Sequence, residues 1–175
     1  MKMNLFNLLF NDNFFDYIIS IGCLHHTQDP KKAFFSIEKK LKEGGYIVLG
    51  LYHKYGRIYT KIRKMIFSVF GEKVFFLDKY LRNKNISYQK RLTWYKDQYK
   101  SPHEISYTIK EVLEWFEEKN LKITKILPIE NLDINSKLFD DYSKNCNNLG
   151  MKEIMLALNV SHASEGGLFT IIAKK

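Results

Sequence analysis

The chain has 175 residues, 45% of them hydrophobic and 15% aromatic, which is the composition of a globular protein with its own core. Its two cysteines, Cys23 and Cys146, are too few for a disulfide framework and favour a reducing compartment. No apolar run approaches the roughly 18 residues of a membrane span, and the first residues do not form a signal peptide. The sequence therefore predicts one cytoplasmic domain.

The positive charge is concentrated in the middle of the chain. Residues 53–100 contain thirteen Lys or Arg and three acids, a net charge of +10, while the whole chain carries +9. Such a segment is either a solvated Lys-rich surface or a binding site for an anionic partner, and its interleaved Tyr and Lys would suit a nucleic acid or an anionic lipid surface.

The segment from Phe15 to Tyr52 predicts a strand, a helix and a second strand. Tyr17 to Ile21 is an apolar, β-branched run, typical of a strand that is covered on both faces. A helix should begin with Asp29 as its N-cap and Pro30 at its first position. Its apolar stripe comprises Ala33, Phe34, Ile37 and Leu41.

Gly44 and Gly45 are expected to end this helix, and Tyr46 to Tyr52 reads as the second buried strand. A helical crossover of this length makes the two strands parallel and the connection right-handed. Both carboxyl ends then lie at one sheet edge, where open α/β sheets bind ligands. The sequence places Gly22 to Thr27 and Tyr52 to Tyr55 at that edge.

Residues 57–107 are expected to form a basic, helical lid over the ligand edge. An amphipathic helix is predicted with Ile58, Ile62, Met65 or Ile66 and Val69 on its apolar side, followed by an irregular stretch. Thr108 and Glu111 form a capping box for a further helix. Strands at Leu121 to Ile129 and Leu168 to Ala173, and a short helix at Met151 to Leu158, complete the expected elements.

The arrangement FDxxxSxGxLHHxxDPxxAFxxIxxxLKxGGxxxxGLY resembles the middle of the class I S-adenosylmethionine-dependent methyltransferases of the small-molecule, type 11-like group. The segment DQYKSPHEISYTIKEVLEWF resembles one subgroup of them. The resemblance covers residues 15–56 and 94–128 and the closing EGGLFTIIAKK. It implies an α/β, partial doubly wound Rossmann-like sheet, strands four to seven of the family, in one domain: a βαβ core at 15–56, the lid at 57–107, and a carboxyl-terminal helix and strand pair at 108–175.

The same resemblance implies S-adenosylmethionine as cofactor, with the backbone of Gly22, Cys23 and Leu24 holding its methionine portion. The family's first three strands, with their Gly-rich loop, precede this region. No GxGxG occurs in the present sequence. The expectation is a truncated or split methyltransferase fragment that is inactive by itself, acting when complete on an unidentified small-molecule acceptor.

His25 is the candidate catalytic residue, as a general base or as a donor that orients the acceptor. Candidate acceptor-site residues follow the second strand or come from the lid: Tyr52, His53, Tyr55, Arg57, Tyr99 and His103. Tyr99, His103 and Glu104 could either close over the acceptor or tether the lid to the core.

Other readings of these side chains are weaker. His26 is expected to stabilise the turn, Asp29 to cap the helix and Asp16 to anchor the strand entrance. A zinc site from His25, His26 and His53 lacks ligand spacing and a supporting acid, so no metal is expected. Cys23 lies on the same tight turn as His25, a poor geometry for a base-activated thiol.

The sequence leaves three functions open: part of a methyltransferase, a non-catalytic scaffold or interaction module derived from one, and anionic-ligand binding through residues 53–100. In the family the fourth strand pairs with the first, so Tyr17 to Ile21 should here form a sheet edge with no protecting Lys or Pro. The expected partner is a separate amino-terminal fragment or a second copy. Nucleic acid and a membrane surface are the less favoured partners.

Overall fold

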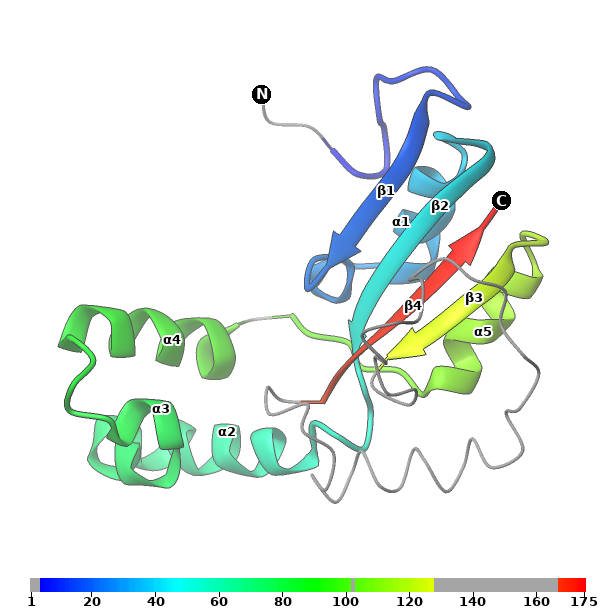
Figure 1. Cartoon of the computed structure of the whole chain (residues 1–175). Helices are drawn as coiled ribbons and strands as arrows, with labels where there is room; N and C mark the ends of the chain where they lie inside the picture. The colour runs from blue at the N-terminus through cyan, green and yellow to red at the C-terminus, as the bar shows by residue number, and fades with distance from the viewer. Residues whose placement is uncertain (1–3, 102, 128–166) are drawn as a thin grey trace.

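One mixed four-stranded sheet forms the centre of the protein (Figure 1). The computed structural model describes residues 4–101, 103–127 and 167–175. The strands β1 (Phe15–Ile21), β2 (Leu41–Tyr52), β3 (Lys122–Leu127) and β4 (Leu168–Lys174) lie in the order β1-β2-β4-β3. β1 and β2 are parallel, as predicted, and β4 is antiparallel to β2 and β3. β1 therefore lies at an edge of the described sheet.

Helices α1 (Pro30–Glu38) and α5 (Ile109–Glu117) pack together over one face of the sheet, where Phe34 contacts Phe116 with 4.8 Å between ring centroids. Their starts confirm the predicted caps. Asp29 Oδ1 accepts from the Lys32 N–H at 2.9 Å, and Thr108 and Glu111 form the reciprocal capping box. α1 is thus the helical connection between the parallel strands β1 and β2.

The start of β2 differs from the prediction. α1 ends at Glu38 and β2 begins at Leu41, so Gly44 and Gly45 lie within the strand rather than at the helix end. The Lys40 carbonyl accepts from the N–H groups of Phe14 and Phe15 at 2.8 and 2.9 Å. This early pairing with β1 ends the helix, and Gly44, at φ +78°, lies in the register shift that follows. Leu41 is buried, but as a strand residue.

The prediction that β1 is covered on both faces is wrong for the described residues. Ser20 faces the covered side, whereas Tyr17, Ile19 and Ile21 are 60%, 71% and 46% exposed. Both helices that contribute to the main core lie on the opposite face. The apolar side chains of β1 on this face are therefore exposed to solvent in the described part of the chain.

The lid is helical throughout most of its length and has a separate small core. It contains α2 (Ile58–Phe70), the 3₁₀ segment η2 (Gly71–Leu77), α3 (Lys79–Arg82) and α4 (Tyr88–Lys100). Figure 1 shows it beyond the carboxyl ends of β1 and β2. Phe67, Leu81, Tyr95 and Tyr99 form its buried core.

Two expectations for the lid need correction. The stretch predicted to be irregular contains α4, whose inward residues Leu92, Tyr95 and Tyr99 recur at helical spacing. The apolar stripe predicted for α2 does not face the core: Thr60 and Phe67 are buried, while Ile58, Ile62, Met65 and Val69 are exposed.

Strands β3 and β4 agree with the predicted positions, and Asn120 ends the preceding helical segment in the left-handed region at φ 53°. The predicted helix at Met151 to Leu158 and Cys146 lie outside the described residues. Within the described ranges, no helix has both the length and the apolarity needed to cross a bilayer.

Candidate functional site

The carboxyl ends of β1 and β2 meet at the edge that the sequence marked for ligand binding. Gly22 follows β1 at φ +73° with open space where a side chain would project. The next residue, Cys23, is exposed and directs its thiol to the Ile21 carbonyl at 3.3 Å. Leu24 is buried at the start of the short 3₁₀ segment η1 (Leu24–His26).

His25 is fully buried behind this edge. Its ring lies 4.1 Å from the Tyr52 ring and 4.2 Å from the His26 ring, centroid to centroid. Neither ring nitrogen has a hydrogen-bond partner among the described residues. Burial, assisted by the charges of His26 and Arg57, lowers the pKa of His25 to about 3. A neutral, weakly basic imidazole favours a positioning role over that of a general base.

This pKa gives a testable pH dependence of stability. Because the unfolded state takes up a proton near the ordinary His pKa and the folded state resists it, stability should fall as the pH drops from about 6.5 toward 3, by at most about 1.4 kcal/mol per pH unit. Urea unfolding at a series of pH values measures the slope. His25→Phe should flatten it, whereas an unchanged slope, or an NMR titration of His25 near neutral pH, would contradict the assignment.

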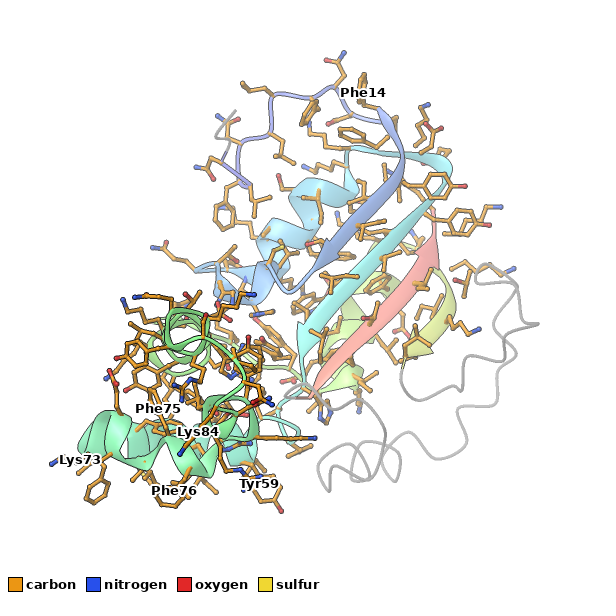
Figure 2. The ribbon with its side chains drawn as sticks, turned by 60° about the vertical axis from the view of Figure 1, so that its left-hand side comes forward. Phe14, Tyr59, Lys73, Phe75, Phe76 and Lys84 are labelled. Atoms are coloured by element: carbon orange, nitrogen blue, oxygen red, sulfur yellow. The ribbon has the colours of Figure 1, made fainter. Side chains whose placement is uncertain are left out.

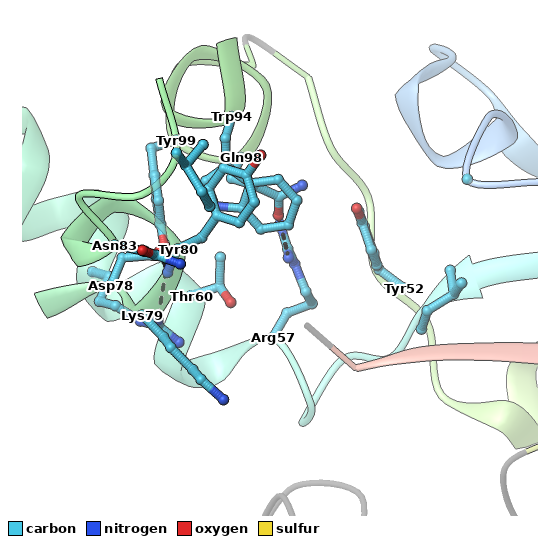
Figure 3. Close-up of a pocket in the computed structure, with 14 residues that line it drawn as sticks. Tyr52, Arg57, Thr60, Asp78, Lys79, Tyr80, Asn83, Trp94, Gln98 and Tyr99 are labelled. Carbon is cyan, nitrogen blue, oxygen red and sulfur yellow. Dashed lines mark hydrogen bonds and ion pairs between the residues drawn. The ribbon is translucent and has the colours of Figure 1, made fainter. Parts of the chain in front are cut away.

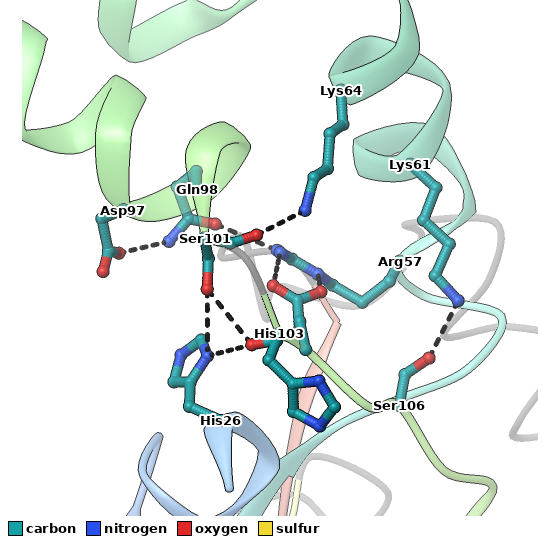
Figure 4. A network of polar contacts seen from close by, with 10 residues as sticks. His26, Arg57, Lys61, Lys64, Asp97, Gln98, Ser101, His103 and Ser106 are labelled. Atoms are coloured by element: carbon teal, nitrogen blue, oxygen red, sulfur yellow. Dashed lines mark hydrogen bonds and ion pairs between the residues drawn. The ribbon is translucent and has the colours of Figure 1, made fainter. Parts of the chain in front are cut away.

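A chain of polar contacts joins the lid to the βαβ core (Figure 4). Nδ1 of His26 lies 3.0 Å from the His103 carbonyl oxygen, with the Ser101 hydroxyl nearby at 3.4 Å. From α2, Lys64 donates to the Ser101 carbonyl and Lys61 to the Ser106 hydroxyl. The His26 side chain thus links η1 to the segment after α4, whereas the sequence led us to expect a contact within its own turn, and His103 takes part through its backbone.

Arg57 is the central residue of this junction. Its side chain, 1% exposed, makes a bidentate contact with Glu104 at 3.0 and 2.7 Å and donates to Gln98 at 3.0 Å. The guanidinium also stacks over the Tyr52 ring at 4.0 Å. Among the described residues, Glu104 therefore contacts the core only indirectly, through Arg57, which stacks over Tyr52 of β2.

The lid and the sheet edge enclose a cavity of about 420 Å³ (Figure 3). Its walls combine aromatic rings with three cationic side chains and one carboxylate. The lining residues are Gly22, Tyr52, Arg57, Thr60, Arg63, Asp78, Lys79, Tyr80, Asn83, Ile86, Trp94, Gln98, Tyr99 and Leu168. Glu104 neutralises Arg57, and Asp78 lies 3.4 Å from Arg63. The remaining cation, Lys79, gives the cavity a net positive character.

Asp78 organises the lid side of the cavity. Its Oδ1 accepts from the N–H groups of Tyr80 and Leu81, and its Oδ2 accepts the Tyr99 hydroxyl at 2.5 Å. Burial and this carboxylate hold the pKa of Tyr99 above its ordinary value, so the phenol keeps its proton. In Figure 3 Tyr99 and Trp94 lie across the cavity from Tyr52.

The structure brings together part of the predicted site. Gly22, Tyr52, Arg57 and Tyr99 line the cavity. His25 lies behind Tyr52, and His53 is buried with its Nδ1 accepting from the Gly56 N–H at 3.2 Å. Predicted residues outside the lining are Cys23, Leu24, His25, His53, Tyr55 and His103. In the part of the chain that the structure describes, no cluster of His, Cys, Asp or Glu could hold a metal ion.

The sequence reasoning missed Asp78, Trp94 and Gln98, which come from the stretch read as irregular. Two of them had a local signal in the sequence. Asp78 stands directly before a helical turn, as an N-cap residue does. Gln98 directly precedes Tyr99, which is buried in the lid. That these residues lie close to the sheet edge could not be predicted from the neighbouring sequence.

Comparison with known proteins finds similarity to methyltransferases. Residues 1–49 match the family described as "Methyltransferase domain". A 58-residue stretch is 40% identical to phosphoethanolamine N-methyltransferase 2 of Caenorhabditis elegans and covers 33% of this chain and 13% of that protein. Among solved structures, the putative methyltransferase of Haloferax volcanii, in complex with the Trm112 activator, aligns with a TM-score of 0.51 at 12% identity, over 98% of this chain and 59% of that one.

A methyltransferase of Methanosarcina mazei gives a TM-score of 0.50 at 14% identity, over 99% of this chain and 65% of the other. The fold is that of an S-adenosylmethionine-dependent methyltransferase. This chain spans about three fifths of the length of the solved relatives. The sequence match to the methyltransferase domain family covers residues 1–49 of the 175.

Proposed function

We propose that this chain forms the acceptor side of a methyltransferase, with a small-molecule acceptor bound in the cavity between the lid and the sheet edge. The observation that carries the proposal is the lining itself. Gly22, from the turn where the family holds its cofactor, and Arg57, Trp94 and Tyr99 from the lid border one space. An acceptor in that space would lie next to the cofactor's methionine end.

The turn after β1 fits the methionine portion of S-adenosylmethionine. Gly22 adopts a positive φ and leaves its surroundings open, and the neighbouring Cys23 is exposed. When bound, the cofactor supplies an electrophilic methyl group on a sulfonium. The sequence contains no GxGxG to approach the rest of the cofactor. Acting by itself, the chain is therefore proposed to be inactive.

Tyr52 is the proposed positioning residue for the acceptor. Its ring is held between the buried His25 ring at 4.1 Å and the Arg57 guanidinium at 4.0 Å, so its orientation is fixed before an acceptor binds. Aromatic walls and the positive charge of Lys79 suit an acceptor with an anionic group and an apolar or cationic body. The C. elegans relative is named for such a compound, a phosphorylated amine.

The partner proposed for β1 is a segment carrying the Gly-rich strands of the family, on the same polypeptide or on another. β1 lies at the described sheet edge and exposes Ile19 (71%) and Tyr17 (60%) on its open face. Pairing along that edge would supply the cofactor loop and cover this apolar face. In its absence the same edge is a hazard for self-association.

Ile19→Lys should therefore reduce self-association of the purified chain. The unaltered chain is expected to form concentration-dependent oligomers in sedimentation velocity, because its edge strand is apolar and exposed, and an added charge opposes association of such strands. Leu9→Lys, at a residue equally exposed (71%) but outside β1, is the matched control. Equal association of both variants and the unaltered chain would contradict a role for β1.

The function is tested by completing the fold. The chain is fused to the Gly-rich amino-terminal strands of a class I methyltransferase, and binding of S-adenosylhomocysteine is measured by calorimetry. The fusion should bind, and Gly22→Ala should weaken binding because a side chain is strained at its positive φ. Gly71→Ala, at a positive φ within the lid, is the matched control.

Phosphoethanolamine is the first acceptor to assay with the fusion. Methyl transfer that falls on Tyr52→Ala would support the proposed cavity. A folded fusion that does not bind S-adenosylhomocysteine, or that is insensitive to Gly22→Ala, would contradict the proposal and favour a non-catalytic scaffold.

A further inference from the structure

The lid helix α2 presents its apolar side to solvent. Ile58, Ile62, Met65 and Val69 follow one another at spacings of three and four residues and so share one face of the helix. They are 44%, 46%, 66% and 72% exposed. The buried residues, Thr60 and Phe67, lie on the opposite face. The apolar stripe is therefore separate from the contacts that hold the lid together.

Exposed aromatic side chains extend this surface. Tyr59 and Phe70 belong to α2 and are 54% and 56% exposed, and Phe76 of η2 is 61% exposed. In Figure 2 Tyr59 and Phe76 lie along the same outer side of the lid. We call the four aliphatic residues of α2, together with Tyr59, Phe70 and Phe76, the outer lid face.

The outer lid face lies within the most basic part of the chain. Residues 53–100 carry thirteen Lys or Arg and three acids, a net charge of +10. The exposed cations include Lys73, Arg82 and Lys84, and Figure 2 shows Lys73 at the end of the lid and Lys84 above Phe76. An exposed apolar helix face in a basic segment, with cations beside it, is the pattern of a helix that lies in the interface of an anionic bilayer.

We propose that the outer lid face docks on an anionic lipid surface. The aliphatic residues would enter the boundary between headgroups and acyl chains, while the surrounding Lys and Arg contact the headgroup phosphates. A nucleic acid would use the cations but would leave Ile62, Met65 and Val69 in water. A second copy of the chain would cover the apolar residues but would meet the same positive charge. The observed combination therefore favours lipid.

The test is density-gradient flotation of the full chain with vesicles of phosphatidylcholine, with and without phosphatidylserine. Aggregated protein stays at the bottom, so flotation reports binding to lipid. The chain should float with the anionic vesicles at low salt, float less as salt rises, and stay down with neutral ones. Met65→Gln combined with Val69→Gln should weaken binding about tenfold or more, because two penetrating side chains are lost. Lys84→Gln should weaken it about fivefold.

Leu9→Gln, which changes an equally exposed residue outside the lid, should leave flotation unchanged. The proposal is overturned if the chain does not float with anionic vesicles at low salt, or if the Met65 and Val69 changes have no effect on binding. Two further results overturn it in favour of another occupant. One is a dimer in solution that these changes dissociate. The other is loss of folding stability in the same variant without any lipid binding, which would show that the chain itself covers the face.

Discussion

Replacing Arg57 by Met should destabilise the lid by roughly 3 to 5 kcal/mol, because it leaves the carboxylate of Glu104 nearly buried and without its bidentate partner. The change also removes the guanidinium from the Tyr52 ring and from Gln98. Urea unfolding followed by Trp94 fluorescence measures the effect. A Trp115→Phe background makes Trp94 the remaining indole and so a reporter for the lid.

The matched control replaces both partners. Arg57→Met together with Glu104→Leu removes the unpaired charge and should recover most of the lost stability, as apolar replacements of buried ion pairs do. Arg57→Lys should recover little, since an ammonium cannot reproduce the planar, two-point contact or the stacking. A loss below about 1 kcal/mol for Arg57→Met would place this pair among ordinary surface ion pairs and contradict its role as the tether.

Asp78→Ala is expected to cost about 2 to 4 kcal/mol of lid stability. The change removes the cap from the N–H groups of Tyr80 and Leu81 and leaves the buried Tyr99 hydroxyl without its acceptor. Because Tyr80 and Tyr99 both line the cavity, the shape of the cavity should change as well. The same Trp94 unfolding assay applies.

Asp97→Ala serves as the control, since it removes an exposed carboxylate from the same lid and should change stability by no more than about 0.5 kcal/mol. Asp78→Asn keeps an oxygen for the helix cap and should lose less than Asp78→Ala. Equal effects of Asp78→Ala and Asp97→Ala would show that the buried network does not stabilise the lid.

The parts of the fold that local chemistry determines could be predicted from the sequence. Asp29 and Pro30 start α1, Thr108 and Glu111 start α5, and a crossover of this length makes β1 and β2 parallel. The same reasoning places Gly22 and Tyr52 at one edge, where they do line the cavity.

Other features depend on which surfaces meet, and a pattern of residues does not carry that information. The period of Ile58, Ile62, Met65 and Val69 indicates a helix, but not that this face is turned outward. Nor could the contacts of Arg57 with Glu104, 47 residues away, or of Asp78 with Tyr99, 21 residues away, be found from spacing. The end of α1 was misplaced because pairing of Lys40 with the start of β1 overrides the usual glycine stop.

Our central proposal is that this chain supplies the acceptor side of a methyltransferase site and needs a Gly-rich segment to hold the rest of the cofactor. Calorimetric titration of the purified chain with S-adenosylmethionine tests it most directly. We expect no saturable heat up to about 1 mM cofactor, since the sequence has no GxGxG loop. One-to-one binding in the micromolar range would contradict the account, because the described turn at Gly22 would then not need a complementary segment.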